Sequence, residues 1–436
     1  MSLVAIGLLG VAICFLLIFL GMPIYIAFTG VGFVGLWMVR GLKAALSSLG
    51  SVPYSTACNY VWSVVPLFVW MGYIVFYSDI AGEFFDGVRR WIGHIRGGLA
   101  HAVVVGNAIF GACCGNPIAS AVTFTSMCLP EMRRYGYADK LTLGGIAAAG
   151  LLAALIPPSM PFIIYGAVTE TSIGKLFIAG VVPGLVLTGL YMAVVHLWCT
   201  RDPQVGPPGP RSTWGQRLRS GLGMWSIIVI MLAIIGGIFA GVFTPTEAGA
   251  AGAAVVLLLS LFRRKLSWDS FKKSLVETGL TTGMVGMLLV GTMLFNSFLV
   301  ATGLPRVIGT AVIHISHGSP VVFMFISVAV LLFMGMFLDA IPILMLTIPI
   351  LHPVAVKLGI DPLHYSIVVN IALLLGTLTP PFGMVVYAVH NTAKDVELME
   401  VFRGTYPFIV AGLVMQVLAI FFPTLSTWLP SLMAGK

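Results

Sequence analysis

The chain has 436 residues, of which 59% are hydrophobic and only 9% are charged, and its mean hydropathy is +1.04. Soluble globular domains carry about a quarter of their residues as charged side chains. The composition therefore excludes a soluble enzyme, a soluble nucleic-acid-binding protein and a disordered protein. The formal net charge of +8 indicates membrane topology, because the cations lie in short loops between apolar segments.

Apolar segments recur along the whole chain, each near the roughly 20 residues that a helix needs to cross a ~30 Å hydrocarbon layer. The first run, residues 2–39, is too long for a signal peptide, so we expect two spans that meet near Gly21 and Pro23. The six cysteines form no CxxC pair, which makes a disulfide framework or a zinc site improbable. The predicted apolar segments are 2–20, 22–39, 59–78, 97–130, 141–168, 176–198, 222–243, 246–262, 276–301, 319–352, 364–390 and 405–428.

Two of these segments are too long for one simple crossing. Segment 97–130 is interrupted by Gly115-Asn116-Pro117, and segment 319–352 is interrupted by the stretch from Asp339 to Pro342. Each pattern predicts a re-entrant helical hairpin that enters the membrane and turns back.

The sequence also repeats at an offset of 223 positions. The doubled proline Pro157-Pro158 recurs as Pro380-Pro381, Pro130 recurs as Pro353, and Asn116 has Asp339 as its counterpart. Repetition at a fixed offset indicates a duplicated structural unit. We predict a first repeat over 1–198, a cytoplasmic linker over 199–221 and a second repeat over 222–436.

The distribution of cations predicts how the two repeats are oriented. Five crossings and one hairpin in each half would place the halves in opposite senses, and 17 of the 23 Lys and Arg residues then fall on one side. By the positive-inside rule that side is cytoplasmic, so both termini face outward and the two hairpins open from opposite faces. The six cations on the outer side are Arg40, Lys43, Lys175, Arg306, Lys357 and Lys436.

Four breaks in the predicted helices are candidates for a binding site. Two are the hairpin tips, and two are the Pro-Pro pairs inside the spans 141–168 and 364–390. A Pro-Pro pair removes two backbone donors, which frees carbonyls for a cation and leaves a half-helix N-terminus that favours an anion. Plain proline kinks are the alternative, but four breaks in two symmetric pairs favour a binding site.

Asp339 is the one carboxylate deep inside a long apolar segment. An ionisable residue at such a position is by default a functional candidate, here as a ligand for an ion or a proton. Asp also suits a helix N-terminus, so capping of the following helix is a compatible role. The side chains of Asn107, Asn296, Asn370 and His390 are expected to form hydrogen bonds between helices instead.

Motifs for nucleotide chemistry are missing from the sequence. The string from Gly30 to Gly35 fits GxGxxG but lies inside an apolar span, and no GxxxxGK[ST] motif occurs. No Ser-His-Asp, HExxH or paired-carboxylate arrangement stands out either. We therefore expect a transporter driven by an ion gradient or a partner, and not an enzyme.

Several longer motifs carry a family resemblance. Residues 129–137 (LPEMRRYGY), 156–166 (IPPSMPFIIYG) and 171–184 (TSIGKLFIAGVVPG) resemble the large membrane subunit of tripartite ATP-independent periplasmic (TRAP) transporters. In the second half, GMFLD at 335–339 and LTPPFG at 378–383 are similar to that family too. The resemblance covers essentially the whole chain.

The resemblance implies an all-α polytopic membrane protein of the bacterial inner membrane, an inverted-repeat transporter of the elevator type with two opposed re-entrant hairpins. It implies sodium as the coupling ion, no organic cofactor, and import of a small organic carboxylate or sulfonate. Two partners are implied: a small four-span membrane subunit and a periplasmic substrate-binding protein.

The family's ligand positions, carried over by motif, lie at the tips and the breaks. Sodium is expected at Gly115, Asn116, Pro158, Asp339, Ala340, Thr377 and Thr379. Substrate contacts are expected at Asn116, Pro117, Ser120, Ser159 and Thr379, with Ser120 and Ser159 also within reach of the ions.

This chain departs from the family at the first tip. Relatives usually have Ser-Gly-Ser-Ser there, whereas this chain has Cys114-Gly115-Asn116-Pro117 and so lacks hydroxyl ligands. Two other functions stay open at this stage: a stand-alone ion-coupled carrier or antiporter that needs no binding protein, and a non-transporting membrane scaffold whose breaks are only structural.

Overall fold

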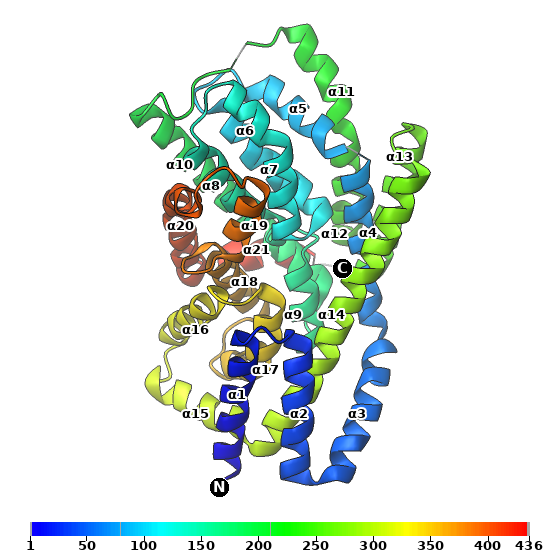
Figure 1. The fold of residues 1–436 in the computed structure, drawn as a ribbon, viewed down its shortest axis with the longest axis vertical. Coiled ribbons are helices and arrows are strands. Elements are labelled where there is room, and N and C mark those ends of the chain that lie inside the picture. Colours follow the sequence, from blue (N-terminus) through cyan, green and yellow to red (C-terminus); the bar gives the residue numbers. More distant parts are fainter. Residues whose placement is uncertain (1, 79, 210, 434–436) are drawn as a thin grey trace.

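The computed structural model describes residues 2–78, 80–209 and 211–433 (Figure 1), and every regular element in these ranges is a helix. Six of the helices are long and apolar enough to span a bilayer: Tyr60–Tyr77, Ile173–Arg201, Pro245–Phe262, Trp268–Thr302, Ala340–Lys357 and Leu398–Phe421. Shorter apolar helices accompany them. The predicted all-α polytopic class is confirmed.

The first half begins with α1 (Leu3–Phe19), α2 (Ile24–Arg40), α3 (Leu42–Ala57), α4 (Val64–Tyr77) and α5 (Ile80–Ile92), and α6 (Gly98–Cys114) is the first helix of the first hairpin. It continues with α7 (Pro117–Arg134), α8 (Asp139–Gly150), a 3₁₀ turn (Leu151–Ala154), α9 (Met160–Thr169) and α10 (Ile173–Arg201). Both ends of the predicted linker, 199–221, are helical, because α10 extends to Arg201 and the next helix begins at Trp214.

The second half starts with α11 (Trp214–Met231), a π segment (Leu232–Gly236), α12 (Gly237–Phe239), α13 (Pro245–Phe262), α14 (Trp268–Thr302) and α15 (Leu304–Ile315). The remaining helices are α16 (Pro320–Gly335), α17 (Ala340–Lys357), α18 (Pro362–Leu378), α19 (Met384–Thr392), α20 (Leu398–Phe421) and α21 (Thr424–Ser431). Both re-entrant segments are thus helix pairs, α6–α7 and α16–α17.

The helix bounds of the two halves follow the 223-residue offset. Helix α7 starts at Pro117 and ends at Arg134, and α17 starts at Ala340 and ends at Lys357, 223 positions later at both ends. The packing shows the same correspondence between the halves. Helix α7 of the first half packs against α19 of the second, and its counterpart α17 packs against α9, the counterpart of α19. Likewise α2 packs against α14 and α13 against α4. The halves are therefore related by an approximate two-fold exchange.

Apolar packing separates one group of helices from the rest. Residues of α1, α2, α3 and α14 form their own buried cluster, in which the rings of Phe28 and Phe295 stack with centroids 5.1 Å apart. The hairpins, the broken spans and α4 belong to the main core. Figure 1 shows α1, α2 and α3 side by side at one end of the molecule, away from α6 and α7.

Three helices were not predicted, namely α3, α5 and α15. In α5 the buried Ile80, Phe84 and Val88 recur at helical spacing while charged side chains occupy the other face, so no continuous apolar run marks the helix. Helix α15 is apolar but has only 12 residues, which is too short to mark a membrane span, and serines dilute the apolar content of α3. Figure 1 shows α5 and α15 at opposite ends of the molecule.

Two predicted segments were also shorter than the helices that the structure shows. The second hairpin was expected to end at 352, but α17 continues through Pro349 and Pro353 to Lys357. The segment predicted to begin at 276 begins at Trp268, because a polar first stretch with Asp269 and two lysines precedes the apolar part of α14.

Helices α16 and α18 cross with their backbones in contact at two glycines. An ideal Cβ on Gly376 would lie 2.6 Å from Cα of Gly335. A methyl group there forces the helices apart, and overpacking of this kind costs about 1–3 kcal/mol. We expect Gly376→Ala to lower the free energy of unfolding by that amount, measured by denaturant titration of the purified protein.

The matched control is Gly279→Ala in α14, where a Cβ meets nothing within 4 Å. Because alanine has the higher helix propensity, this change should leave stability unchanged or raise it. Equal stability losses in both variants would contradict the packing argument.

Candidate functional site

The first hairpin tip is a tight helix-to-helix turn. Helix α6 ends at Gly115 in the left-handed conformation, with φ of +63°, and Asn116 caps α7 by accepting a hydrogen bond from the Ala119 N–H at 3.1 Å. Pro117 occupies the first helical position, where its missing N–H costs nothing. Asn116 is exposed, and Pro117 is half-buried.

The tip lies against the first broken span. An ideal Cβ on Gly115 would lie 3.0 Å from the carbonyl oxygen of Pro158. Cys114, Gly115 and Pro158 help to line a cavity of about 10 Å³ at this point. That volume is close to the minimum that holds a single water-sized species.

The first break is entirely buried and its backbone is open. The carbonyl oxygens of Leu155, Ile156, Pro157 and Pro158 accept no hydrogen bond from the described residues. Unpaired carbonyls at membrane depth are tolerated only where they are buried in protein or line a cavity. The break therefore offers oxygen ligands in a site that is shielded from bulk water in this conformation.

The second tip has the corresponding arrangement. Asp339 caps α17, and its Oδ1 accepts a hydrogen bond from the Ala340 N–H at 2.8 Å. Asp339 is half-buried, and Ala340 is buried. The contact between Gly335 and Gly376 holds the end of α16 next to the second break.

The second break differs from the first in exposure. Pro381 and Phe382 are exposed, and Thr379 is half-buried. The carbonyls of Pro380, Pro381 and Phe382 accept no hydrogen bond from the described residues. Aromatic side chains surround this tip, since the Phe337 ring lies 5.5 Å from Phe382 and 5.6 Å from Phe19, centroid to centroid.

Serine and threonine hydroxyls of the predicted site are already bonded to backbone or amide oxygens. Ser159 Oγ donates to the Ala154 carbonyl at 2.5 Å, and Ser120 Oγ donates to Asn107 Oδ1 at 2.7 Å. Thr377 and Thr379 each donate to a carbonyl of the preceding turn. Each hydroxyl oxygen keeps lone pairs that can still bind a cation.

Two side-chain hydrogen bonds connect the halves at this level. Asn370 Nδ2 in α18 donates to the carbonyl of Ala154 at 2.8 Å, and Tyr165 in α9 contacts His352 Nδ1 in α17 at 2.9 Å. Asn107 and Asn370 therefore form hydrogen bonds between helices, as the sequence predicted. The sequence did not show that the partner of Asn370 is a carbonyl next to the break in the other repeat.

An ion triad ties the base of the first hairpin to the second half. Arg133 at the end of α7 contacts Asp139 at 2.8 Å and Asp395, in the α19–α20 loop, at 2.7 Å. The hydrogen bond from the Arg133 guanidinium holds the pKa of Asp395 below its usual range. The first hairpin and the second broken span thus share an anchor outside the candidate site.

The oxygen ligands available at the site favour a hard cation over a transition metal. No group of three or more His, Cys, Asp or Glu side chains occurs among the described residues, which argues against a transition-metal centre there. One carboxylate, Asp339, stands beside carbonyl and hydroxyl oxygens. No Lys or Arg lies within 98–132, 141–174, 320–356 or 358–393, so an anion would depend on helix N-termini.

Comparison with known proteins agrees with this arrangement. The family model described as "Tripartite ATP-independent periplasmic transporter, DctM component" matches residues 11–425. The chain belongs to the DctM family of TRAP transporters. It is a multi-pass protein of the bacterial inner membrane.

Three relatives extend along almost the whole chain. The sialic acid TRAP transporter large permease SiaM of Vibrio cholerae is 31% identical, covering 96% of this chain and 97% of its own. The C4-dicarboxylate large permease DctM of Pseudomonas aeruginosa is 33% identical, covering 89% and 90%. The ectoine/5-hydroxyectoine large permease UehC of Ruegeria pomeroyi is 33% identical, covering 96% and 97%.

A solved structure supports the fold. The YdaH transporter of Alcanivorax borkumensis superposes with a TM-score of 0.63 over 96% of this chain and 98% of that chain, at 13% identity. At that identity the similarity concerns the fold alone.

The shared carbonyl of Ala154 generates a prediction. Ser159 and Asn370 donate to the same oxygen, so either single variant leaves one donor in place, whereas the pair leaves a buried carbonyl unpaired. We expect Ser159→Ala with Asn370→Leu to destabilise the protein by about 1 kcal/mol more than the sum of the single variants. Denaturant titrations of the purified variants measure this coupling.

Combining Asn370→Leu with Thr292→Val provides the control. Thr292 is buried in α14 and bonds to its own helix at Leu288. The losses in free energy of unfolding from those two changes should be additive within error. Additive losses for the Ser159 and Asn370 pair would contradict the shared-acceptor geometry.

Proposed function

We propose that this chain is the large membrane subunit of a sodium-coupled importer of a small organic anion, a carboxylate or a sulfonate. One observation carries the proposal: two hairpin tips stand against two broken spans at an offset of 223, and the first break is buried with four carbonyls that accept no hydrogen bond from the described residues. Discontinuous helices of this kind bind ions at exposed carbonyls and anions at half-helix N-termini.

The proposed sodium ligands are grouped at the two tips. The first group is Gly115, Asn116 and Pro158, beside the cavity of about 10 Å³. The second group is Asp339, Ala340, Thr377 and Thr379. Because the site contains no basic side chain, bound sodium would supply positive charge near the substrate and so couple the two binding events.

The anionic substrate is proposed to bind at the N-termini of α7, α9 and α19, with contacts from Asn116, Pro117, Ser120, Ser159 and Thr379. The permeases named for sialic acid, C4-dicarboxylates and ectoine all serve compounds that carry a carboxylate. The word tripartite in the family description supports two partners, a small membrane subunit and a periplasmic binding protein.

We propose further that the hairpins and broken spans move as one transport domain against a scaffold built from the outer spans. The separate apolar cluster of α1, α2, α3 and α14 supports this division. Coupling requires only that the empty or half-loaded domain moves poorly, which is a difference in affinity between two conformations.

Uptake into proteoliposomes tests the function. The chain and its candidate small subunit are reconstituted with and without the binding protein and an inward sodium gradient. Uptake that requires both additions supports the proposal. Uptake without the binding protein would indicate the stand-alone carrier, and a proton requirement would contradict sodium coupling.

Asp339→Asn separates the ion-binding role of this residue from its capping role. Asparagine still caps α17 but lacks the charge, so we expect the sodium concentration for half-maximal uptake to rise about tenfold or more. Asp361→Asn is the matched control, because Asp361 caps α18 in the same way, with Oδ1 accepting from the Leu363 N–H at 2.8 Å. An unchanged sodium dependence of uptake in Asp339→Asn would contradict a sodium-binding role for this carboxylate.

Crosslinking tests the movement. Phe19 in α1 contacts Phe337 at the second tip, so a thiol crosslinker across Phe19→Cys and Phe337→Cys, in a chain without its native cysteines, should abolish uptake reversibly. Tyr73→Cys with Thr281→Cys joins α4 to α14, where the side chains are 2.9 Å apart. We count α4 with the proposed scaffold in this test because it packs along α13 and α14, although its apolar side chains belong to the main core. That control pair should leave uptake intact, and full activity of both crosslinked pairs would argue against a sliding domain.

A further inference from the structure

A polar cavity of about 230 Å³ lies outside the transport site, at the face that carries most of the arginines. It opens where the end of α5, the start of α6 and the end of α7 meet the segment that leads into α11. The lining residues are Arg89, Arg90, Gly93, Leu99, Tyr135, Gly209, Ser212 and Gln216.

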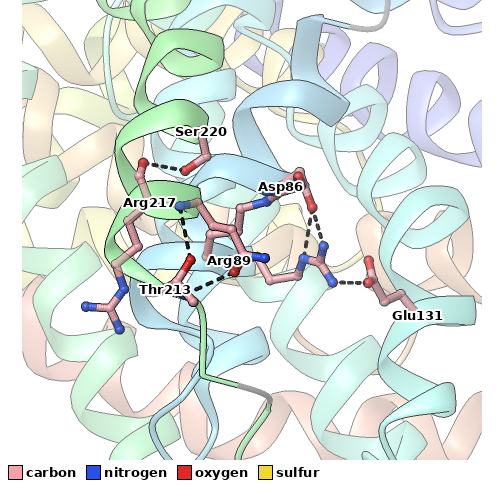
Figure 2. Close-up of polar contacts among 8 residues, drawn as sticks. Asp86, Arg89, Glu131, Thr213, Arg217 and Ser220 are labelled. Carbon is pink, nitrogen blue, oxygen red and sulfur yellow. Dashed lines mark hydrogen bonds and ion pairs between the residues drawn. The ribbon is translucent and has the colours of Figure 1, made fainter.

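Arg89 links α5 to α7 beside this cavity. Its guanidinium donates to Asp86 on the same helix and to Glu131 on α7, as Figure 2 shows. Helix α11 packs beside α5 and begins at a capping box formed by Thr213 and Gln216. The charge of Arg89 is therefore balanced by two carboxylates, neither of which lines the cavity.

The other polar side chains of the lining each carry a donor that meets no acceptor among the described residues. Arg90 uses Nε for Asp86 at 2.9 Å, which leaves its two terminal nitrogens without a partner among the described residues. The hydroxyls of Tyr135 and Ser212 and the amide nitrogen of Gln216 likewise make no hydrogen bond within the described chain. A cavity lined by unpaired donors and no carboxylate selects an anion.

The surroundings favour an anion at a membrane surface. Arg217 adds charge and lies over the Trp214 ring, 5.3 Å from its centroid, and the nearby Arg96 and Arg211 are exposed. Trp91 and Trp214 are 40% and 70% exposed, as expected for side chains at the headgroup level. Basic pockets between helices on the cytoplasmic side bind phosphate-bearing lipid headgroups.

We propose that this cavity binds a phosphate group, which is presented by an anionic phospholipid of the adjacent leaflet or by a soluble phosphate ester. Arg90 and Tyr135 would hold the phosphate oxygens from one side, and Ser212 and Gln216 from the other. The ligand would join α5, the base of the first hairpin and the segment that connects the repeats. The site is independent of the proposed substrate and sodium site.

Native mass spectrometry of the purified full chain tests this proposal. Phosphatidylglycerol is titrated against phosphatidylcholine, with inorganic phosphate as a competitor. We expect preferential binding of phosphatidylglycerol, weakened about tenfold by Arg90→Gln, since a hydrogen bond to a charged group is worth about one such factor. Tyr135→Phe, which removes only a hydroxyl and so keeps the fold, should weaken binding in the same direction.

Arg201→Gln is the matched control, because Arg201 is an exposed cation at the end of α10 that does not line the cavity. It should bind phosphatidylglycerol like the unmodified chain. Competition by millimolar inorganic phosphate would assign the site to soluble phosphates, and resistance to it would assign the site to the lipid. Equal binding by all variants, or no preference for phosphatidylglycerol and no phosphate competition, would overturn the proposal.

Discussion

The structure depends on one constraint, namely that a backbone carbonyl at membrane depth has no water to bond with. Most of the chain meets this constraint with uninterrupted helices. Two Pro-Pro pairs violate it, and the fold responds by placing a hairpin tip against each break. At the first break the carbonyl of Ala154 receives two side-chain donors, while the next four carbonyls receive none from the part of the chain that the structure describes. Such carbonyls are tolerated at membrane depth because the surrounding protein buries them.

Helix α5 connects the end of α13 to the hairpin helix α7 through ion pairs near its two ends. Glu83 near its start contacts Arg263 at 2.5 Å and Lys265 at 3.2 Å, at the end of α13. Arg89 near its other end reaches Glu131 on the hairpin helix α7. A movement of the hairpin relative to α13 must therefore rotate α5 or break one of these contacts, and both contacts lie where water can replace them.

Composition and patterning predicted much of this molecule. The two hairpins, the paired breaks and the 223-residue offset follow from prolines, glycines and the lengths of apolar runs. Helix α5 was not predicted because an amphipathic helix has no continuous hydrophobic run, and α15 was not predicted because its apolar run is too short to cross a membrane. The partner of Asn370 could not be predicted either, since a contact between α18 and the first break depends on how two distant segments pack. Asp339 was recognisable because a lone carboxylate in an apolar run is costly, whereas its immediate role as a helix cap is a matter of local geometry.

The two breaks share a Pro-Pro pair at equivalent positions of the repeats but differ in accessibility. The segment at 155–160 is buried, whereas Pro381 and Phe382 face the surface. In a molecule whose halves exchange by a two-fold operation, swapping these two local environments produces a second arrangement that uses the same contacts in opposite places. The free-energy difference between the two arrangements then reflects only the residues at which the halves differ, such as Asn116 against Asp339. Sequence differences between the repeats would then determine which of the two arrangements is more populated. Substitutions that make the halves more alike would bring the two populations closer to equal.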